Sequence, residues 1–299
     1  MEDQFIKVKE AISIFFFIFW AIMAFFFYKI PVCLGTQGPT ITVIVSSEIR
    51  PYKEALGGLK SSLTFPIQEY NYRSNPKLVE HVLKSESSDF VVAIGPEAAK
   101  AARASSPLPP HKKLYLMVLD PKSLLKQQKI CGVDLRIPVE RQLDAISKRF
   151  PPPVRIGILY NALENQKIID EFVKKAEWFN ATVTGIQVNT PKDCPGALIK
   201  NRKNIDILLF IPDTIVIKEA LVQYLIKESI FRGIAVVGYN HFFIENGAVM
   251  SLSIDYEEVG KLGANLLKQI WDGGKCSLLP PPFKLEWNQR AWDTVRQRR

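Results

Sequence analysis

The feature that most constrains the fold is a regular alternation of two kinds of segment after residue 35. Short runs rich in Val, Ile and Leu are followed by longer segments with the period of an amphipathic helix, which is typical of parallel sheets covered by helices. We expect strands at 41–45, 90–94, 113–118, 155–160, 182–188, 207–211 and 234–237. We expect helices at 51–61, 76–84, 97–104, 139–150, 162–179, 215–232 and 256–271. The predicted fold class is therefore α/β.

The alternation is interrupted near the middle of the chain by three consecutive prolines at 151–153. Proline has no backbone N–H and restricts the residue before it, so the preceding helix cannot continue through this run. A second series of strands and helices begins at residue 154. A chain of 299 residues also fits two domains of ordinary size. The sequence therefore predicts two Rossmann-like lobes with parallel sheets.

The first 35 residues differ from the rest and contain an uncharged run of eighteen residues at 11–28. As a helix this run would be about 27 Å long, close to the roughly 30 Å hydrocarbon core of a bilayer. We interpret it as one N-terminal transmembrane helix, a retained anchor. A cleaved signal peptide and lipid attachment at Cys33 are the alternatives; the bulky side chains at 25–28 disfavour the first, and Val32 disfavours the second. All three place the remaining chain in the periplasm or on the extracellular face.

Charge and cysteine usage exclude several classes of function. The net charge is +9, but the basic residues are mostly scattered, so we expect no nucleic-acid partner. The four cysteines, Cys33, Cys131, Cys194 and Cys276, lie far apart and form no C-x-x-C pair, which argues against a zinc site or a dithiol redox centre. The sequence leaves open whether they form disulfides or stay as buried thiols.

No motif indicates catalysis or a cofactor. The chain has no G-x-S-x-G, H-E-x-x-H or phosphate-binding glycine loop. None of the three histidines, His81, His111 and His241, is placed near a credible nucleophile. We therefore predict that the protein is not an enzyme and that it uses no cofactor and no metal.

Candidate binding residues follow from the topology. In open parallel sheets, ligands bind beyond the carboxyl ends of the strands, where loops lead into helices. The polar and glycine-containing loops at these positions nominate Ser46, Ser47, Gly95, Pro96, Glu97, Tyr160, Asn161, Asp213, Tyr239 and Asn240 as ligand-binding residues.

Each lobe is expected to bind a different part of the ligand. Helix N-termini and the hydroxyl groups of the first loop would hold a carboxylate in the first lobe. Asp213 in the opposite lobe would accept hydrogen bonds from a ligand ammonium, while Tyr160 and Tyr239 would wall an apolar or aromatic portion. Ser, Asn and Asp after strands are also the usual helix caps, so for each position both roles stay open, above all for Asp213.

Several segments of the sequence resemble those of a known family. The segments IRPYKEALGGLK (49–60), AIGPEAAKAA (93–102), PPPVRIGILYN (151–161) and IDILLFIPDTIVIKEAL (205–221), followed by residues 234–271, come in the order found in that family. They resemble the periplasmic-binding-protein type I fold, and within it the solute-binding proteins of ABC importers related to the tryptophan/tyrosine-type binding proteins.

The resemblance implies a two-lobed clamp that closes by a hinge on a small solute and presents it to an ABC permease. It implies ligand contacts from Asp213 and Asn240, and a hinge crossing at 253–256 that adds Asp255 to the candidate ligand-binding residues. It divides the chain into the anchor or signal segment 1–35, lobe 1 (36–134 and 254–276) and lobe 2 (135–253 and 277–299). Glu97 departs from the pattern, because many relatives carry a small or hydroxyl residue there.

The resulting functional prediction is an extracytoplasmic solute-binding protein of an ABC-type importer, anchored in the inner membrane by its N-terminal helix. Its ligand would be a small metabolite such as an amino acid. The alternative is a membrane-tethered sensory or partner-binding ectodomain with the same fold, whose partner would be a membrane sensor protein instead of a permease.

Overall fold

The computed structural model describes residues 38–298 except 86 and 128. Residues 39–299 form one compact unit, which contains both sheets and all of the core described below. The transmembrane helix expected at 11–28 lies outside the described residues. Within residues 38–298, no helix is both long and apolar enough to cross a bilayer.

Lobe 1 is built on a six-stranded sheet with the order β11-β5-β4-β3-β1-β2, in which every pairing is parallel. Its strands are β1 (Ile41–Val45), β2 (Ile67–Asn71), β3 (Phe90–Ile94), β4 (Lys113–Val118), β5 (Cys131–Asp134) and β11 (Leu278–Leu279). Its helices are α2 (Arg50–Ser62), α3 (Pro76–Lys84), α4 (Pro96–Ser105), α5 (Pro121–Leu125) and α11 (Tyr256–Trp271).

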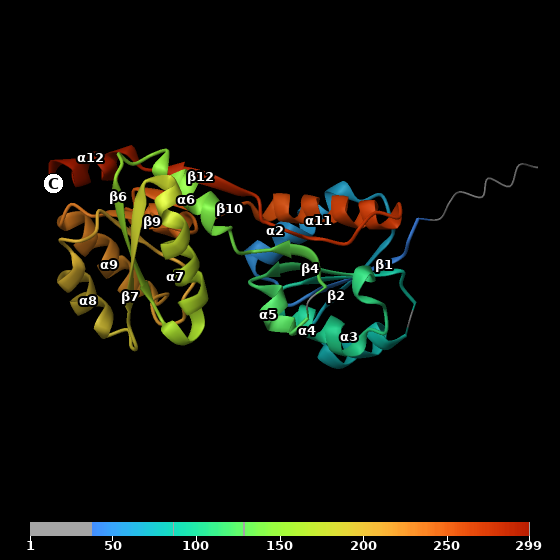
Figure 1. Ribbon diagram of the computed structural model, residues 1–299. Helices are drawn as coiled ribbons and strands as arrows, with labels where there is room; N and C mark the ends of the chain where they lie inside the picture. Colours follow the sequence, from blue (N-terminus) through green and yellow to red (C-terminus); the bar gives the residue numbers. More distant parts are fainter. Residues whose placement is uncertain (1–37, 86, 128, 299) are drawn as a thin grey trace, which may run out of the picture. The chain divides into compact units, whose positions relative to one another are not determined.

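Helices cover both faces of this sheet, with α2 and α11 on one side and α3 and α4 on the other (Figure 1). The strand β1 shows why both faces of the sheet need to be covered. Ile41, Val43 and Val45 pack in the cluster under α2 and α11, whereas Ile44 packs in the cluster under α3 and α4. Alternate side chains of a strand point to opposite faces, so an uninterrupted apolar run is buried on both sides.

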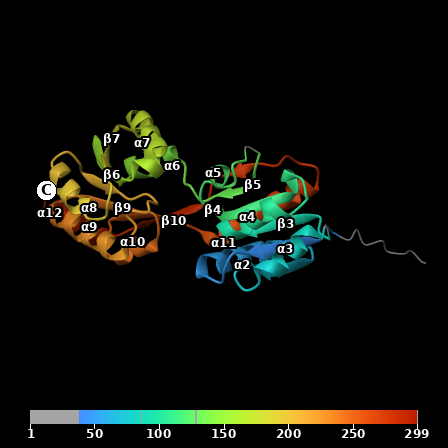
Figure 2. The ribbon, with the colours of Figure 1, turned by 90° about the horizontal axis from the view of Figure 1, so that it is seen from below.

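Lobe 2 has a second six-stranded sheet with the order β12-β10-β9-β8-β6-β7. Its strands are β6 (Val154–Tyr160), β7 (Ala181–Gln187), β8 (Ile207–Leu209), β9 (Ala235–Gly238), β10 (Met250–Ile254) and β12 (Phe283–Trp287), of which β12 runs antiparallel to β10. Its helices are α6 (Val139–Ser147), α7 (Ala162–Ala176), α8 (Asp193–Asn201), α9 (Glu219–Phe231), α10 (His241–Glu245) and α12 (Gln289–Gln297). In Figure 2, α6 and α7 lie on one side of this sheet and α8, α9 and α10 on the other.

The two sheets share one topology, because each places its second strand at one edge and then adds the later strands in order beyond the first. The chain passes between them three times, at 135–138, at Asp255 and at 280–282. The expected boundary at 276/277 is too early. Residues 277–299 were assigned to lobe 2, but Leu278–Leu279 pair with β5, so the first sheet takes a strand from this last segment.

Two features hold lobe 1 together beside its core. A disulfide joins Cys131 in β5 to Cys276, just before β11. Elsewhere in the lobe, α2 and α11 approach so closely that a methyl group on Gly58 would lie 2.0 Å from the carbonyl oxygen of Glu257. A methyl group on Gly260 would lie 1.9 Å from the carbonyl oxygen of Ala55. Glycine is therefore needed at both contact points.

The sequence located most of the long buried elements, and most of the elements that it missed are short or partly exposed. The strands expected at 41–45, 90–94 and 113–118 and the helices expected at 76–84 and 256–271 have the predicted bounds. The expectation missed β2, β5, β10, β11, β12, α5, α8, α10 and α12. β2 is an edge strand with the polar sequence IQEYN and incomplete burial, so it lacks the apolar run used to find strands.

Candidate functional site

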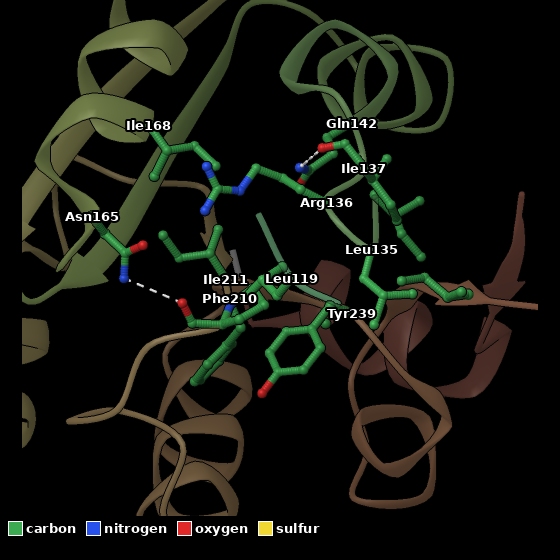
Figure 3. Close-up of a pocket in the computed structure, with 14 residues that line it drawn as sticks. Leu119, Leu135, Arg136, Ile137, Gln142, Asn165, Ile168, Phe210, Ile211 and Tyr239 are labelled. Carbon is green, nitrogen blue, oxygen red and sulfur yellow. Dashed lines mark hydrogen bonds between the residues drawn. The ribbon is translucent and has the colours of Figure 1, made fainter. Parts of the chain in front are cut away.

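An apolar cavity lies where the chain crosses between the two sheets, beside the carboxyl ends of β8 and β9 (Figure 3). Both the first crossing and the end of β10 line it. Its walls are formed by Leu119, Leu135, Arg136, Ile137, Gln142, Asn165, Ile168, Phe210, Ile211, Pro212, Gly238, Tyr239, Leu252 and Ile254. Such a cavity, mostly apolar with a few polar groups, is typical of a small-molecule site.

Among the described residues that line this cavity, Arg136 is the one that carries a charge, and it lies in the first crossing. Its backbone N–H donates to Asp134 Oδ1 at 2.9 Å, and its guanidinium lies 3.3 Å from Asp120 Oδ2. Figure 3 shows its side chain extending toward Ile168. The side chain is 36% exposed, so the guanidinium keeps contact with solvent while it lines the cavity. A planar guanidinium in this setting is suited to a carboxylate.

The neighbouring carboxyl groups are already engaged. Asp134 accepts hydrogen bonds from the backbone N–H groups of Asp120 and Arg136. Burial raises the pKa of Asp134 above its ordinary value, and these hydrogen bonds oppose the rise without cancelling it. Asp120 itself caps α5, because its Oδ1 accepts from the Ser123 N–H at 3.2 Å.

Two amide side chains are fixed in the cavity wall. Gln142 donates through Nε2 to the carbonyl oxygen of Ile137 at 2.7 Å. Asn165 donates through Nδ2 to Asp213 Oδ2 at 2.8 Å and to the carbonyl oxygen of Pro212 at 3.2 Å. Because both groups are buried and held by these bonds, they define the shape of the wall on the lobe 2 side.

Aromatic rings form another part of the wall. Phe210 and Tyr239 both line the cavity, and both rings contact Phe243, at centroid distances of 5.0 and 4.8 Å. Burial, with smaller contributions from Tyr256 and Asp213, raises the pKa of Tyr239 to about 12. Its hydroxyl group is therefore neutral near pH 7 and is able to donate a hydrogen bond.

Asp213 has a capping role in this structure. It is 3% exposed, and its carboxylate accepts four hydrogen bonds from protein donors. Oδ2 accepts from the Asn161 N–H at 2.7 Å and from the Asn165 amide, while Oδ1 accepts from the N–H groups of Ile215 and Val216 at 3.0 and 3.2 Å. A carboxylate offers about four acceptor positions, so these bonds occupy them all.

Other candidates at the ends of the lobe 2 strands have local partners too. Tyr160 donates its hydroxyl to Gln166 Oε1 at 2.9 Å, and Asn161 caps α7 by accepting from the Leu163 N–H. Asn240 precedes α10, and its buried Oδ1 has no hydrogen-bond partner among the described residues. Of the candidates named from sequence, Tyr239 alone lines the cavity.

In lobe 1 the candidates lie at the ends of β1 and β3, and none of them lines the cavity. Ser46 is buried and its Oγ accepts from the Ala98 N–H at 2.9 Å, which caps α4. Gly95 has a φ of 94°, and a methyl group there would lie 2.5 Å from Ser46 Oγ. Ser47 and Pro96 are partly buried and Glu97 is exposed.

Asp255 stands where the chain crosses from β10 into α11. It caps α11 by accepting from the Glu258 N–H at 3.2 Å and forms an ion pair with Lys284 at 2.6 Å. Burial alone would raise the pKa of Asp255, but the hydrogen bond from Lys284 and that from the Glu258 N–H outweigh it, so the pKa lies below its ordinary value.

Sequence reasoning missed most of the cavity. Leu119 follows the expected strand 113–118, so the rule for strand ends was an available signal for it. Leu135 and Arg136 follow β5, which the sequence pattern did not predict, so the same rule gives no signal for them. Asn165 and Ile168 lie inside α7, where no sequence pattern separates a cavity wall from an ordinary core position.

Among the residues that the structure describes, no three His, Cys, Asp or Glu side chains come together in a way that could hold a metal ion.

Two lobes of one α/β topology, joined by crossings beside an apolar cavity, define a two-lobed binding protein of the periplasmic-binding-protein type I fold. The chain belongs to the family of ABC transporter substrate binding proteins, whose model matches residues 67–284. The resemblance found in the sequence is therefore confirmed, and the family is one of solute-binding proteins.

Individual relatives agree with this assignment. The chain is 24% identical over 207 residues to a tyrosine-binding protein of Clostridioides difficile (strain R20291), an alignment that covers 66% of this chain and 58% of that protein. The chain thus spans less than two thirds of that relative's length.

Solved structures show the same fold. A ligand-free, open substrate binding protein with adhesive properties from Clostridium difficile has a TM-score of 0.70 at 18% identity, covering 86% of this chain and 95% of that one. An ABC domain from Streptococcus pneumonia in complex with L-Trp has a TM-score of 0.58 at 19% identity, covering 87% and 95%.

Proposed function

We propose that this protein is the extracytoplasmic solute-binding component of an ABC importer and that it binds a small aromatic carboxylate, such as an aromatic amino acid. The observation that carries the proposal is the cavity at the lobe crossings, which combines apolar and aromatic walls with the cationic side chain of Arg136. The relatives named for tyrosine and complexed with L-Trp support the aromatic class.

Each part of the ligand has a matching group in this scheme. The Arg136 guanidinium binds the carboxylate, because it is the cation that lines the cavity. Phe210 and Tyr239 contact the aromatic ring, and the neutral Tyr239 hydroxyl donates to a polar group on it. Ligand contacts to residues on both sides of the crossings stabilise one arrangement of the lobes over others, which is how a clamp responds to its solute.

The candidates outside the cavity remain part of the proposal in a different role. The caps at Ser46, Asn161, Asp213 and Asp255 fix the loops at the strand ends. Asn240 differs from them, because its buried Oδ1 has no hydrogen-bond partner among the described residues. Asp213 is not the proposed partner of a ligand ammonium, because protein donors already occupy its four acceptor positions.

The proposed location is outside the cytoplasm, with the sequence run 11–28 as the membrane tether. The disulfide between Cys131 and Cys276 supports an oxidising compartment. Free Cys194 is consistent with this, because it is buried, and burial raises the pKa of its thiol to about 11. It is therefore held as an unreactive thiol.

Isothermal calorimetry on residues 39–299 tests the ligand class with three matched probes. L-tyrosine has both a carboxylate and an ammonium, 3-(4-hydroxyphenyl)propionate has the carboxylate alone, and tyramine has the ammonium alone. We expect the first two to bind and tyramine to bind weakly. R136Q should weaken binding of both carboxylates by about 30-fold, the loss of one charge-assisted contact.

The matched control is R141Q, since Arg141 is exposed on the neighbouring helix α6 and lies outside the cavity lining. It should leave binding unchanged. Equal losses in R136Q and R141Q, or binding of tyramine as tight as that of L-tyrosine, would contradict the assigned role of Arg136. Absence of binding for all three probes and for L-tryptophan would contradict the aromatic class itself.

A sensory ectodomain is the second candidate. The uncharged run 11–28, which ends in bulky side chains unlike a cleavage site, favours a permanently tethered protein. Genes for a permease and an ATPase beside this one would support the importer, whereas a neighbouring kinase or receptor gene would support sensing. The mass of the mature N-terminus tells whether the tether is retained.

A further inference from the structure

The end of lobe 1 where the strands begin carries an exposed tryptophan among basic residues. All pairings in the lobe 1 sheet are parallel, so the amino ends of β1, β3, β4, β5 and β11 lie at one end. Helix α11 runs toward this end and finishes there at Trp271, as Figure 1 shows. Trp271 is 46% exposed, and its ring contacts the first residue of β3, Phe90, at a centroid distance of 6.3 Å.

Basic side chains surround this tryptophan. The Nζ atom of Lys112 lies 5.9 Å from the centre of the Phe90 ring, which Trp271 also contacts. Next to Lys112 is a surface hollow lined by Pro110, His111, Lys122, Lys129, Ile130, Lys275, Cys276, Ser277 and Leu278. This lining includes three lysines and a histidine but no Asp or Glu. We call Trp271, Lys112, Lys129 and Lys275 with this hollow the basic end of lobe 1.

The lysines at this end are not neutralised by ion pairs within the part of the chain that the structure describes. No ion pair among the described residues involves Lys112, Lys129 or Lys275. Two acidic residues of the described part of the chain lie nearby. Asp89 accepts hydrogen bonds from the N–H and hydroxyl of Thr40, and Asp272 is exposed beside Trp271. Among the described residues the three lysines outnumber these two carboxylates, so this part of the surface carries a net positive charge.

The chain also enters lobe 1 at this end. Thr40 directly precedes β1, whose start lies four strand spacings from β11, or about 19 Å. The uncharged run 11–28 ends about ten residues before Pro39, so a tether of that length reaches at most roughly 35 Å. A chain anchored through that run therefore holds this end of lobe 1 close to the membrane.

We propose that the basic end of lobe 1 docks on an anionic lipid surface, with Trp271 at the level of the headgroups and the lysines on lipid phosphates. This inference rests on the membrane tether of the proposed function. Tryptophan is enriched at membrane interfaces because one part of its ring system is apolar and the other donates a hydrogen bond. Lysines near an anionic surface add attraction that salt weakens. Docking would hold a tethered protein in one orientation on its membrane.

Vesicle flotation of residues 39–299 tests the surface without the tether. The fragment contains both complete sheets, and circular dichroism checks that it is folded. We expect it to float with phosphatidylcholine vesicles that contain 30% phosphatidylglycerol at low salt, and not with phosphatidylcholine alone. Raising the salt to about 0.5 M should release it. K129Q and K275Q should each weaken binding roughly fivefold.

Matched substitutions in lobe 2 separate this surface from general attraction. W271A should weaken vesicle binding severalfold, whereas W178A should not, although Trp178 is the more exposed at 68%. K167Q with K174Q, two exposed lysines of α7, should leave vesicle binding unchanged. The lysine variants keep the test valid if W271A fails to fold.

Several results of these experiments would overturn the proposed docking on lipid. Equal flotation with both lipid mixtures, or equal losses in the lobe 1 and lobe 2 variants, overturns the proposal. Stabilisation by inorganic phosphate without vesicle binding assigns the hollow to a free anion and overturns it as well. L-tyrosine calorimetry on the same variants reports separately on the proposed solute site, and mass spectrometry of the mature N-terminus reports on the tether.

Discussion

The two lobes have the same strand order but close their sheets in different ways. Lobe 1 ends with the two-residue parallel strand β11, and a disulfide ties the segment before it to β5. Lobe 2 ends with the five-residue antiparallel strand β12, and here aromatic packing replaces the covalent bond. Phe150, Trp287 and Trp292 contact one another at centroid distances of 5.4 to 5.9 Å.

The two lobes therefore stabilise the same topology in two different ways. A two-residue strand makes too few hydrogen bonds and buries too little surface to hold the chain end, so lobe 1 depends on a crosslink. A longer strand followed by the amphipathic helix α12 buries enough apolar surface to hold itself. We therefore expect lobe 1 to be sensitive to redox conditions and helix spacing, and lobe 2 to be insensitive to both.

The largest expected effect is loss of the disulfide. The double substitution C131A/C276A opens a loop with a sequence separation of 145 residues, and we expect it to lower the free energy of unfolding of lobe 1 by about 3 to 5 kcal/mol. Hydrogen exchange under native conditions measures this lobe by lobe. C194A, which removes the buried lobe 2 thiol without breaking a crosslink, is the control and should cost about 1 kcal/mol. Equal protection of lobe 1 in both variants would contradict the comparison.

A smaller effect is expected from the contact between α2 and α11. G58A places a methyl group against the carbonyl oxygen of Glu257, so the helices must move apart, and we expect lobe 1 to lose about 3 kcal/mol. The neighbouring Gly57 has no atom within 4 Å of such a methyl group. G57A should therefore stabilise the exposed side of the helix by about 0.5 to 1 kcal/mol. Urea denaturation compares the pair; a loss of the same size in both would show that helix spacing is not critical.

The smallest effect lies in lobe 2 and depends on pH. His241 Nδ1 lies 2.5 Å from Glu286 Oε2, and this contact raises the pKa of His241, while Glu245 at 3.5 Å adds to the rise. Burial alone would raise the pKa of Glu286, but hydrogen bonds from Ser253 and His241 hold it below its ordinary value. A raised histidine pKa stabilises the fold below about pH 6.5, and this gain is lost as pH rises through the folded-state pKa. A lowered Glu pKa stabilises above about pH 4.5 and its gain is lost as pH falls.

The pair should therefore contribute most between these two values. NMR titration of the His241 ring should give a pKa that falls in E286Q, while H111Q, which removes an exposed histidine of lobe 1, should leave it unchanged. An unchanged His241 titration in E286Q would show that the contact does not form in solution. Because the His241 side chain is 64% exposed, we expect the effect on stability to be slight.

The sequence predicted the fold because its buried strands are uniform apolar runs. ITVIV at 41–45 and FVVAI at 90–94 are buried along their whole length, and both were found with the correct bounds. The short strands β5 and β11 and the antiparallel β12 have no such run, so only their pairing partners define them. The hydrophobic pattern identifies a strand whose own side chains are apolar and buried. It misses a strand that is defined only by its hydrogen bonds to a neighbouring strand.

The site was less predictable, since a polar residue after a strand has two roles that look identical in sequence. Asp213 and Ser46 were nominated for ligand contact, with capping as the alternative, and the structure shows each of them accepting hydrogen bonds from helix or turn N–H groups. Tyr239 was nominated and does line the cavity. Arg136 was not nominated, because nothing in its local sequence distinguishes it from the other scattered basic residues.

By itself, the sequence determined the α/β class, the two lobes and the family, since these follow from local hydrophobic patterns and from motifs that keep their order along the chain. The tertiary structure alone decided which cysteines pair, that Gly58 and Gly260 face a neighbouring helix, and that Arg136 shares a cavity with Phe210 and Tyr239. Those residues are far apart along the chain. Their proximity depends on how helices and strands pack across the sheets, and that packing depends on many side chains at once.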